Sequence, residues 1–192
     1  IEAVATNQLS GGVPTVTNIT KGKKVNVWDG VSTTSPAFSF AWSDSPAWVA
    51  MDVLLHPRYG LGAFVTLRDI DLQSFKDWAD YCDDSITTDG TSHTRWQYDS
   101  VLDVAQPAWS VIQEIAASGR ASMVYAGSKF KVKIETTTSA SQLFCMGNIV
   151  RGSYQCSYLN PDTRPNFIEV QYVNRDLGYD QDVAQLESAS AI

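Results

Sequence analysis

Histidine and cysteine are scarce in this sequence, and this limits the chemistry it can support. The two histidines, His56 and His93, have no second histidine or carboxylate at ligand spacing. Zinc and iron sites need such clusters, so we expect no metal centre of that kind. The three cysteines, Cys82, Cys145 and Cys156, are odd in number and lack CxxC spacing. This excludes a zinc module and a disulfide framework, and we expect buried free thiols.

Nucleotide-binding and nucleophile motifs are also missing. The sequence has no Walker A motif, no GxGxxG and no GxSxG elbow, each of which provides a specific backbone geometry for its chemistry. The densest carboxylate group, Asp83, Asp84 and Asp89, does not have EF-hand spacing. We interpret it as a solvated helix end and loop, with a calcium site as the alternative. We therefore predict a protein that is not an enzyme, with no catalytic residues, no cofactor and no bound metal.

Acidic residues outnumber basic ones, and the sequence has no long apolar run. The net charge is −7, from 14 basic and 21 acidic residues. Because phosphate affinity comes mainly from Lys and Arg, we expect no nucleic-acid specificity. No stretch has the length of an apolar transmembrane span, so we expect no membrane span. The first residues, Ile1 to Val4, include no initiator Met and no signal peptide, and we expect the chain to be part of a longer protein.

What the sequence does contain predicts three helices. Pro46 suits the first helical turn after Asp44 or Ser45 as a cap, and Pro57 should end that helix near His56. The next helix is expected over 69–84, capped by Asp69 or Asp71, and the third over 106–118, with Gly119 following its end. One tryptophan on each helix is expected in the core: Trp48, Trp78 and Trp109.

Alternating segments predict strands between and after the helices. We expect strands at 24–28, 95–98, 149–158 and 167–173, and a hairpin of 121–125 with 129–135. Residues 85–94 are interpreted as a polar loop, and Asn160-Pro161-Asp162 as a turn. The fold class is α+β: three helices with mostly antiparallel strands, preceded by the last strands of a β-rich domain. The expected domains are 1–45, the last strands of that β-rich domain, and 46–192, an α+β domain.

An ordered series of short motifs resembles a known family. SPAW at 45–48, DVLL at 52–55 and PRYGLG at 57–62 resemble the "NPAW…DLLTNPRYGLG" run of phage tail-tip proteins, the family of the host-specificity protein J of lambda-like phages and related tail hubs. WADYCDD at 78–84 is similar to the family's "A.YCDE". Later segments continue the likeness in the same order, so that it spans about 20–183. Asp44-Ser45 and His56 are mild departures from the pattern.

The resemblance implies a structural role and a location. Tail hubs are trimers at the distal end of the tail tube, synthesised in the cytoplasm of the bacterial host and assembled at the virion tail tip. The implied partners are two further copies of the chain, the tail tube, the tape measure and other tip components. Residues 1–45 would end a barrel domain, and 46–192 would form the α+β hub domain that braces it. The motif residues, to which we assign a structural role, are Pro46, Trp48, Arg58, Tyr59, Gly60, Gly62, Tyr81 and Cys82.

The glycine pair of this motif predicts a buried turn. We expect positive φ at Gly60 or Gly62, with Tyr59 and Leu61 anchored in the core and Arg58 bonded to the carbonyls of the preceding helix end. Two other functions remain open. A carbohydrate-binding module would expose Trp28, Trp42 or Trp96 in a groove, and a cell-wall hydrolase domain would need two carboxylates or a zinc triad in a cleft.

Overall fold

The computed structural model describes residues 20–88, 90–103, 105–158, 160, 165–174 and 177–187. The chain forms two compact units, Ile1–Thr137 and Thr138–Ile192. The expectations for residues 1–19, for Asp89 and for the turn at Pro161 lie outside the described residues. The division into domains at 45 and 46 stays a prediction.

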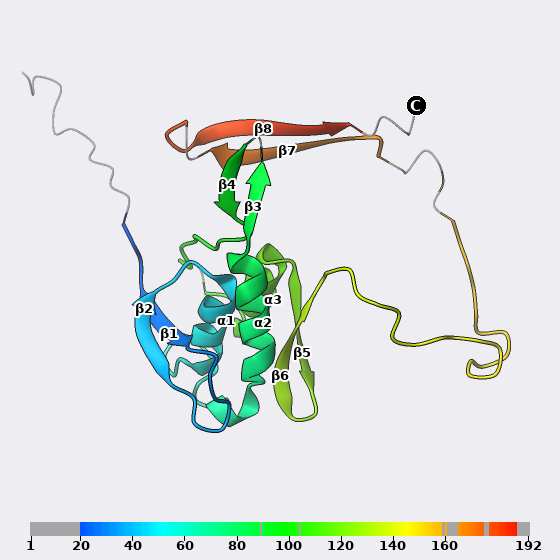
Figure 1. Ribbon diagram of the computed structural model, residues 1–192, viewed down its shortest axis with the longest axis horizontal. Helices are drawn as coiled ribbons and strands as arrows, with labels where there is room; N and C mark the ends of the chain where they lie inside the picture. Colours follow the sequence, from blue (N-terminus) through cyan, green and yellow to red (C-terminus); the bar gives the residue numbers. More distant parts are fainter. Residues whose placement is uncertain are drawn as a thin grey trace, which may run out of the picture. The chain divides into compact units, whose positions relative to one another are not determined.

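In its described residues, the first unit contains three helices and three antiparallel hairpins (Figure 1). Its elements are β1 (Lys24–Trp28), β2 (Phe38–Trp42), α1 (Pro46–Leu55), a 3-10 turn η2 (Leu67–Asp69), α2 (Leu72–Asp83), β3 (Ser85–Thr88), β4 (Thr91–Thr94), α3 (Ala108–Ser118), β5 (Ala121–Ala126) and β6 (Lys129–Ile134). The predicted α+β class is confirmed, and no closed barrel occurs in the described part of the chain.

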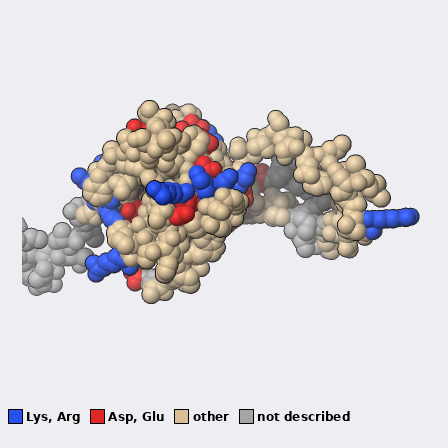
Figure 2. Space-filling model, turned by 90° about the horizontal axis from the view of Figure 1, so that it is seen from below, with Lys and Arg blue, Asp and Glu red and all other residues tan. Residues whose placement is uncertain are grey.

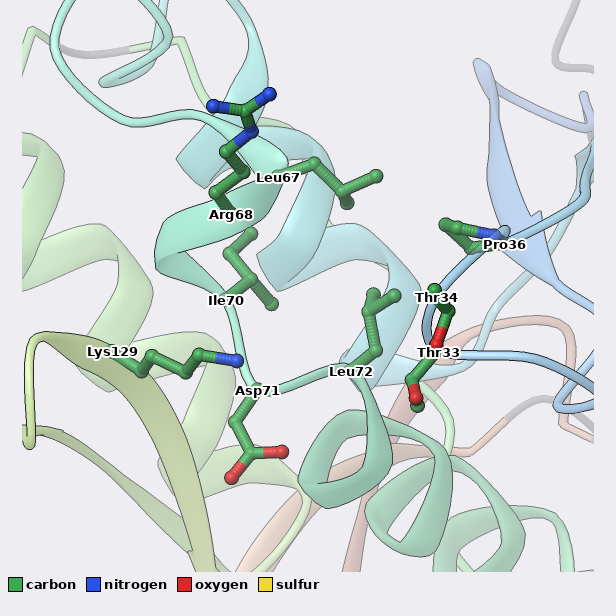
Figure 3. A pocket seen from close by; sticks show the side chains of 9 residues that line it. All are labelled: Thr33, Thr34, Pro36, Leu67, Arg68, Ile70, Asp71, Leu72 and Lys129. Atoms are coloured by element: carbon green, nitrogen blue, oxygen red, sulfur yellow. The ribbon is translucent and has the colours of Figure 1, made fainter.

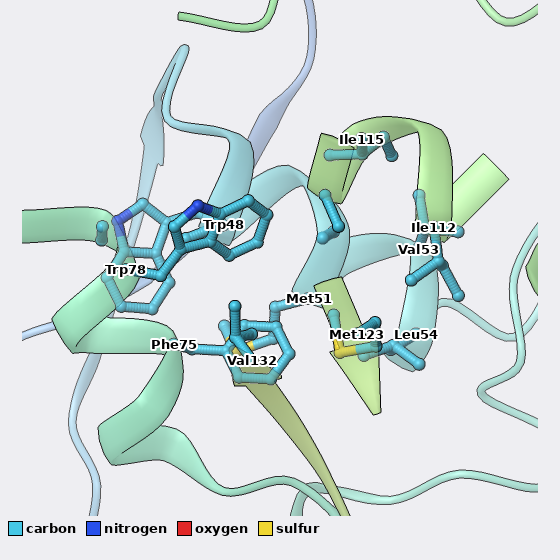
Figure 4. Packing of buried hydrophobic residues seen from close by; sticks show 14 of the residues in the cluster. Trp48, Met51, Val53, Leu54, Phe75, Trp78, Ile112, Ile115, Met123 and Val132 are labelled. Carbon is cyan, nitrogen blue, oxygen red and sulfur yellow. The ribbon is translucent and has the colours of Figure 1, made fainter. Parts of the chain in front are cut away.

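The hydrophobic core of this unit is built where the three helices meet the β1–β2 and β5–β6 hairpins. Figure 4 shows side chains of α1, α2, α3, β5 and β6 filling one cluster. Trp48 and Trp78 are buried there as predicted, and the Trp78 indole Nε1 donates to the Gly119 carbonyl at 3.0 Å. Trp109 differs, because 40% of its surface is exposed at the first turn of α3. The prediction of a buried Trp109 was wrong, since Val111 and Ile112 take the core-facing positions instead.

The helix boundaries follow the proline signals closely. The helix α1 begins at Pro46, and its C-cap is His56, directly before Pro57. The stretch expected as one helix from 69 is interrupted, because Asp69 closes a capping box with Thr66 around η2. Asp71 then occupies the N-cap of α2 without a side-chain capping bond. Ser45 likewise occupies the N-cap of α1 without a side-chain capping hydrogen bond.

The third helix and its end differ in detail from the prediction. The helix begins at Ala108 rather than 106, with Pro107 at the N-cap. Gly119 follows its end, as predicted, with a φ of −96°. A Cβ at Gly119 would lie 2.8 Å from the Trp78 Nε1 atom. Close packing of the Trp78 indole therefore favours glycine at this position.

Several strand predictions need correction. The predicted strand at 24–28 and the predicted hairpin of β5 and β6 are confirmed. Residues 85–94, expected as a loop, form the β3–β4 hairpin, and 95–98 is not a strand. Arg95 instead closes the end of that hairpin, its backbone N–H donating to Asp84 O at 2.9 Å. These two strands were missed because they consist almost entirely of polar residues, in which alternation gave no signal.

The second unit contains one hairpin in its described residues. The strands β7 (Phe167–Asn174) and β8 (Asp180–Glu187) pair antiparallel over eight residues each. The prediction at 167–173 is confirmed, whereas residues 149–158 form no strand in their described part. Cys145 and Cys156 are exposed in this unit, so the prediction of buried thiols holds only for Cys82. No described helix of either unit has the length and apolar character needed to cross a membrane.

Candidate functional site

The motif residues 57–62 fold back against the C-terminal end of α1. Gly60 N–H donates to the His56 carbonyl at 3.1 Å, and Leu61 N–H donates to the Val53 carbonyl at 3.1 Å. Gly62 N–H also reaches His56 O, at 3.2 Å. These donors satisfy carbonyls that the end of a helix leaves without intrahelical partners. The loop is therefore a backbone cap on α1.

Both glycines are required by the closeness of this cap. A Cβ at Gly60 would lie 1.8 Å from Val53 O, and one at Gly62 would lie 2.0 Å from Leu55 O. Neither glycine is among the residues with positive φ. The predicted reason for these glycines was therefore wrong: close approach of two backbones selects them, and left-handed geometry does not.

A polar cluster ties this loop to Lys23, the residue before β1. The Lys23 ammonium lies 2.8 Å from Asp52 Oδ2, and the Tyr59 hydroxyl donates a short hydrogen bond to the same oxygen. The Tyr59 ring stacks on His56 with centroids 3.7 Å apart, and Lys23 Nζ lies 4.4 Å from the Tyr59 ring centroid. Asp52 is 16% exposed at its side chain, so this pair is better shielded than an open surface pair.

Two expectations for this loop were wrong. Tyr59 is 47% exposed and lies over the cluster of Lys23 and Asp52 rather than in the core. Arg58 is exposed, and among the described contacts its side chain does not bond the carbonyls at the end of α1. Backbone N–H groups of the loop donate instead to the carbonyls of Val53 and His56.

The remaining motif residues belong to the helix packing. Pro46 and Trp48 are buried in α1, and Cys82 is buried in α2. Burial raises the pKa of the Cys82 thiol to about 12, with the Asp83 carboxylate adding to the effect. Tyr81 is half-buried, and the Arg95 guanidinium lies 4.5 Å from its ring centroid. These residues form one side of the core and its rim, and the structural role assigned to the motif stays a prediction.

A groove of about 1090 Å³ borders the polar cluster. Its walls come from the start of β1, the end of β2, the outer side of α1 and the loop that precedes α3. Trp42 and Tyr59 line it, but the Lys21 ammonium lies 4.5 Å from the Trp42 ring centroid and Lys23 covers Tyr59. Sugar rings bind on open aromatic faces, and each of these two rings has a cation over one face.

The other tryptophans of the carbohydrate-binding alternative lie elsewhere. Trp28 is 2% exposed and belongs to the core, so the expectation that it is accessible was wrong. Trp96 is 36% exposed and does not line the groove. The structure therefore does not bring Trp28, Trp42 and Trp96 together into one platform.

A second hollow of about 520 Å³ lies at the N-terminal end of α2 (Figure 3). Lys129 and Arg68 border it together with the hydroxyls of Thr33 and Thr34. The Asp71 carboxylate stands in the same hollow, with Lys131 Nζ 3.7 Å away. The Asp71 carboxylate occupies the position at the helix N-terminus that would suit a bound anion. We therefore interpret the charges around this hollow as balanced by the protein's own residues.

The acidic residues at the end of α2 form no metal site in the part of the chain that the structure describes. Within the described residues no group of three His, Cys, Asp or Glu side chains is arranged to hold a metal ion. Burial raises the pKa of Asp83, and the carboxylates of Asp44 and Asp80 raise it further. Asp84 pairs with Arg95 Nη2 at 3.1 Å. Near the middle of the view in Figure 2, basic side chains lie next to acidic ones, so neighbouring charges offset one another there.

The known proteins to which the chain is similar include two that carry the same name. The chain is 28% identical to the Tip attachment protein J of Escherichia phage SECphi27 over 158 residues, which are 81% of this chain and 13% of that protein. It is 26% identical to the Tip attachment protein J of Escherichia phage SECphi4 over 183 residues, 90% of this chain and 16% of the relative. No protein-family model matches the chain.

These relatives confirm the coarse part of the predicted resemblance. The likeness to phage tail-tip proteins extends over most of the chain. The chain spans less than a fifth of the length of the curated relatives it matches. The closer assignment to the lambda-like branch stays a prediction.

Proposed function

We propose that the chain is a structural, non-enzymatic component of a phage or prophage tail tip, and part of a trimeric central hub. In this role it closes the distal end of the tail tube and supports host attachment. Its partners are two further copies of itself, the tail tube, the tape measure and other tip components. Its location is the virion tail tip, after synthesis in the host cytoplasm.

The observation that supports this proposal is the similarity to two tip attachment proteins over 81% and 90% of the chain. The geometry of the motif agrees with a scaffolding role. Its glycines, Gly60 and Gly62, serve a close contact between two backbones, and its buried residues serve helix packing.

Immunogold labelling of tails tests the location. Antibody raised against the 192-residue chain is applied to particles induced from the source strain, and the particles are imaged by negative stain. We expect gold at the distal end of the tails. Gold confined to soluble material, while bare tails are present on the same grid, contradicts the proposal.

A glycan-binding control separates the carbohydrate alternative. Tryptophan fluorescence of the chain is followed while cell-wall glycans are added, with the Trp42→Phe variant beside it. A tail-hub scaffold predicts no saturable change in either protein. A saturable change that is lost in Trp42→Phe would favour glycan binding in the groove.

A further inference from the structure

Three lysines share the outer face of the β5–β6 hairpin in the first unit. Lys129, Lys131 and Lys133 alternate along β6 with apolar side chains that pack in or against the core, of which Val132 is 6% exposed. Because successive side chains of a strand point to opposite faces, the three lysines lie on the face that points away from the core. Alternate side chains of one strand are about 7 Å apart. These three residues therefore form a straight, evenly spaced lysine row.

The strand opposite the lysine row supplies no compensating charge. The direct cross-strand partners of the three lysines are Ala126, Val124 and Ser122, in that order. Opposite charges at such paired positions would stabilise the hairpin, whereas neighbouring ammonium groups on one strand repel each other. Beyond the end of β6, the Glu135 N–H donates to the Arg120 carbonyl at 2.9 Å, so this acidic residue is paired across the hairpin with a further basic one.

Few carboxylates lie against the lysine row. Lys131 Nζ is 3.7 Å from Oδ2 of Asp71, the residue that balances the hollow at the N-terminal end of α2. Lys129 and Lys133 are exposed, and neither has an ion pair in the part of the chain that the structure describes. The row therefore keeps an excess of positive charge, although the net charge of the whole chain is −7.

The backbone beneath the lysine row is bonded to the start of α2. Val132 N–H donates to Ser74 Oγ at 3.1 Å, and Asp71 N–H donates to the Phe130 carbonyl at 2.9 Å. The side chains on the inner face of β6 are anchored at the core. The lysines therefore start from fixed positions, and this lowers the entropy that binding of a partner must offset.

The chemistry of this face favours an acidic protein over nucleic acid or lipid. Single-stranded nucleic acids stack on aromatic side chains beside basic groups, but Tyr125 and Phe130 belong to the opposite face of the hairpin. The row contains no arginine, whose planar fork binds phosphate in a bidentate way. Its apolar neighbour Val124 is half-buried, so the face offers no large apolar side chain to enter a membrane. Carboxylates on alternate positions of an extended strand have the same spacing of about 7 Å.

We propose that the outer face of the β5–β6 hairpin is a docking surface for an acidic protein segment with carboxylates on alternate positions of an extended strand. Each carboxylate pairs with one lysine of the row. Because exposed ion pairs contribute specificity and association rate more than affinity, the contact is weak and depends on salt. This inference goes beyond the hub role, and it depends neither on the number of copies nor on the location of the chain.

Two peptides of equal composition test the spacing. A fluorescein-labelled peptide of four Thr-Glu repeats is titrated with the 192-residue chain at low ionic strength and followed by fluorescence anisotropy. In the control peptide, four threonines precede four glutamates. We expect saturable binding of the alternating peptide that weakens as salt is added, and weaker binding of the control. Absence of saturable binding, or equal or tighter binding of the control, overturns the proposal.

A pair of double variants tests the location. Lys129→Gln with Lys133→Gln removes two charges from the row, and Lys21→Gln with Lys24→Gln removes two charges at the start of the first hairpin, so the two variants have the same net charge. We expect the first variant to weaken binding about tenfold, because two exposed ion pairs are lost, and the second to leave it nearly unchanged. Equal weakening by both variants would mean that net charge alone attracts the peptide, and it overturns the assignment to this face.

Two other anions separate the classes of partner. A thymidine oligonucleotide and a vesicle of phosphatidylglycerol with phosphatidylcholine are compared with the alternating peptide at equal concentration of negative charge. We expect both to bind more weakly than the peptide. Tighter binding of either one that is lost in Lys129→Gln with Lys133→Gln makes the row a nucleic-acid or membrane surface and overturns the proposal. Gold labelling of tails is independent of these titrations, so failure of one leaves the other standing.

Discussion

The two units of this chain place their apolar residues in opposite ways. The first unit buries its large side chains in one core, where Phe75 and Trp78 have no exposed surface. The second unit has exposed apolar side chains on its only described hairpin, with Leu186 at 71% exposure. The first unit therefore buries its apolar side chains within itself, whereas the described hairpin of the second unit leaves them exposed. This difference predicts where substitutions alter stability and where they do not.

The largest expected effect on stability is the loss of a core side chain from the first unit. Phe75→Ala should lower its free energy of unfolding by about 3–5 kcal/mol, because a fully buried ring is lost and a cavity remains. Phe167→Ala, at a position with 47% exposure in the second unit, should leave that transition unchanged. Thermal unfolding followed by near-ultraviolet circular dichroism measures both. Equal losses would remove the distinction between the units.

A slightly smaller effect is expected at the cap of α1. Gly60→Val places a Cβ where Val53 O lies 1.8 Å away, so the cap must open. We expect a loss of about 3 kcal/mol and a melting temperature lower by roughly 10 °C. Gly22→Val is the control, because nothing lies within 4 Å of a Cβ there and its φ is not positive. An unchanged melting temperature in Gly60→Val would refute the close-contact explanation.

The polar cluster beside the cap should contribute less. Asp52→Asn removes the charge that Lys23 Nζ approaches at 2.8 Å, while an oxygen remains for the Tyr59 hydroxyl. We expect a loss of about 1 kcal/mol that shrinks as salt is added. Asp77→Asn, on the exposed side of α2, is the matched charge control. The free energy of unfolding is measured by denaturant titration at low and at high salt. A loss that does not depend on salt would mean that packing, and not charge, stabilises the cluster.

Thiol labelling compares the units without changing stability. A thiol reagent at neutral pH should modify Cys145 and Cys156 quickly and Cys82 only when the first unit opens, because the buried Cys82 thiol has a pKa raised to about 12. Equal labelling of all three thiols would contradict the assignment.

The raised pKa of Cys82 also predicts how stability depends on pH. Below the ordinary thiol pKa of 9.0, Cys82 is neutral in both the folded and the unfolded chain, so it does not alter the free energy of unfolding. As pH rises from 9.0 towards 12, the thiol ionises first in the unfolded chain, and the free energy of unfolding falls. Cys82→Ala should reduce that alkaline loss.

Local sequence signals predicted the elements with a strong local cause. Pro46 and Pro57 bounded α1, and alternation with the two-residue turn at Gly127 and Ser128, both with positive φ, placed β5 and β6. The strand at Phe167 was found by the same alternation. The β3–β4 hairpin was missed because all its residues except Ile86 are polar, so that no alternation of apolar and polar residues marks its strands. The partner strand β8 was missed for a related reason, since its pattern DQDVAQLE reads as polar.

The sequence by itself determined the α+β class, the three helices and the motif that resembles tail-tip proteins. Proline geometry and hydrophobic periodicity act over a few residues, so they can be read from the chain alone. The tertiary structure decided that Trp109 is exposed while Trp28 is buried, and that Gly60 is needed for a close contact rather than for positive φ. It also decided that Cys82 alone is a buried thiol. Each of these outcomes depends on which surfaces meet across the core, and a side chain's own sequence neighbours do not specify its partners there.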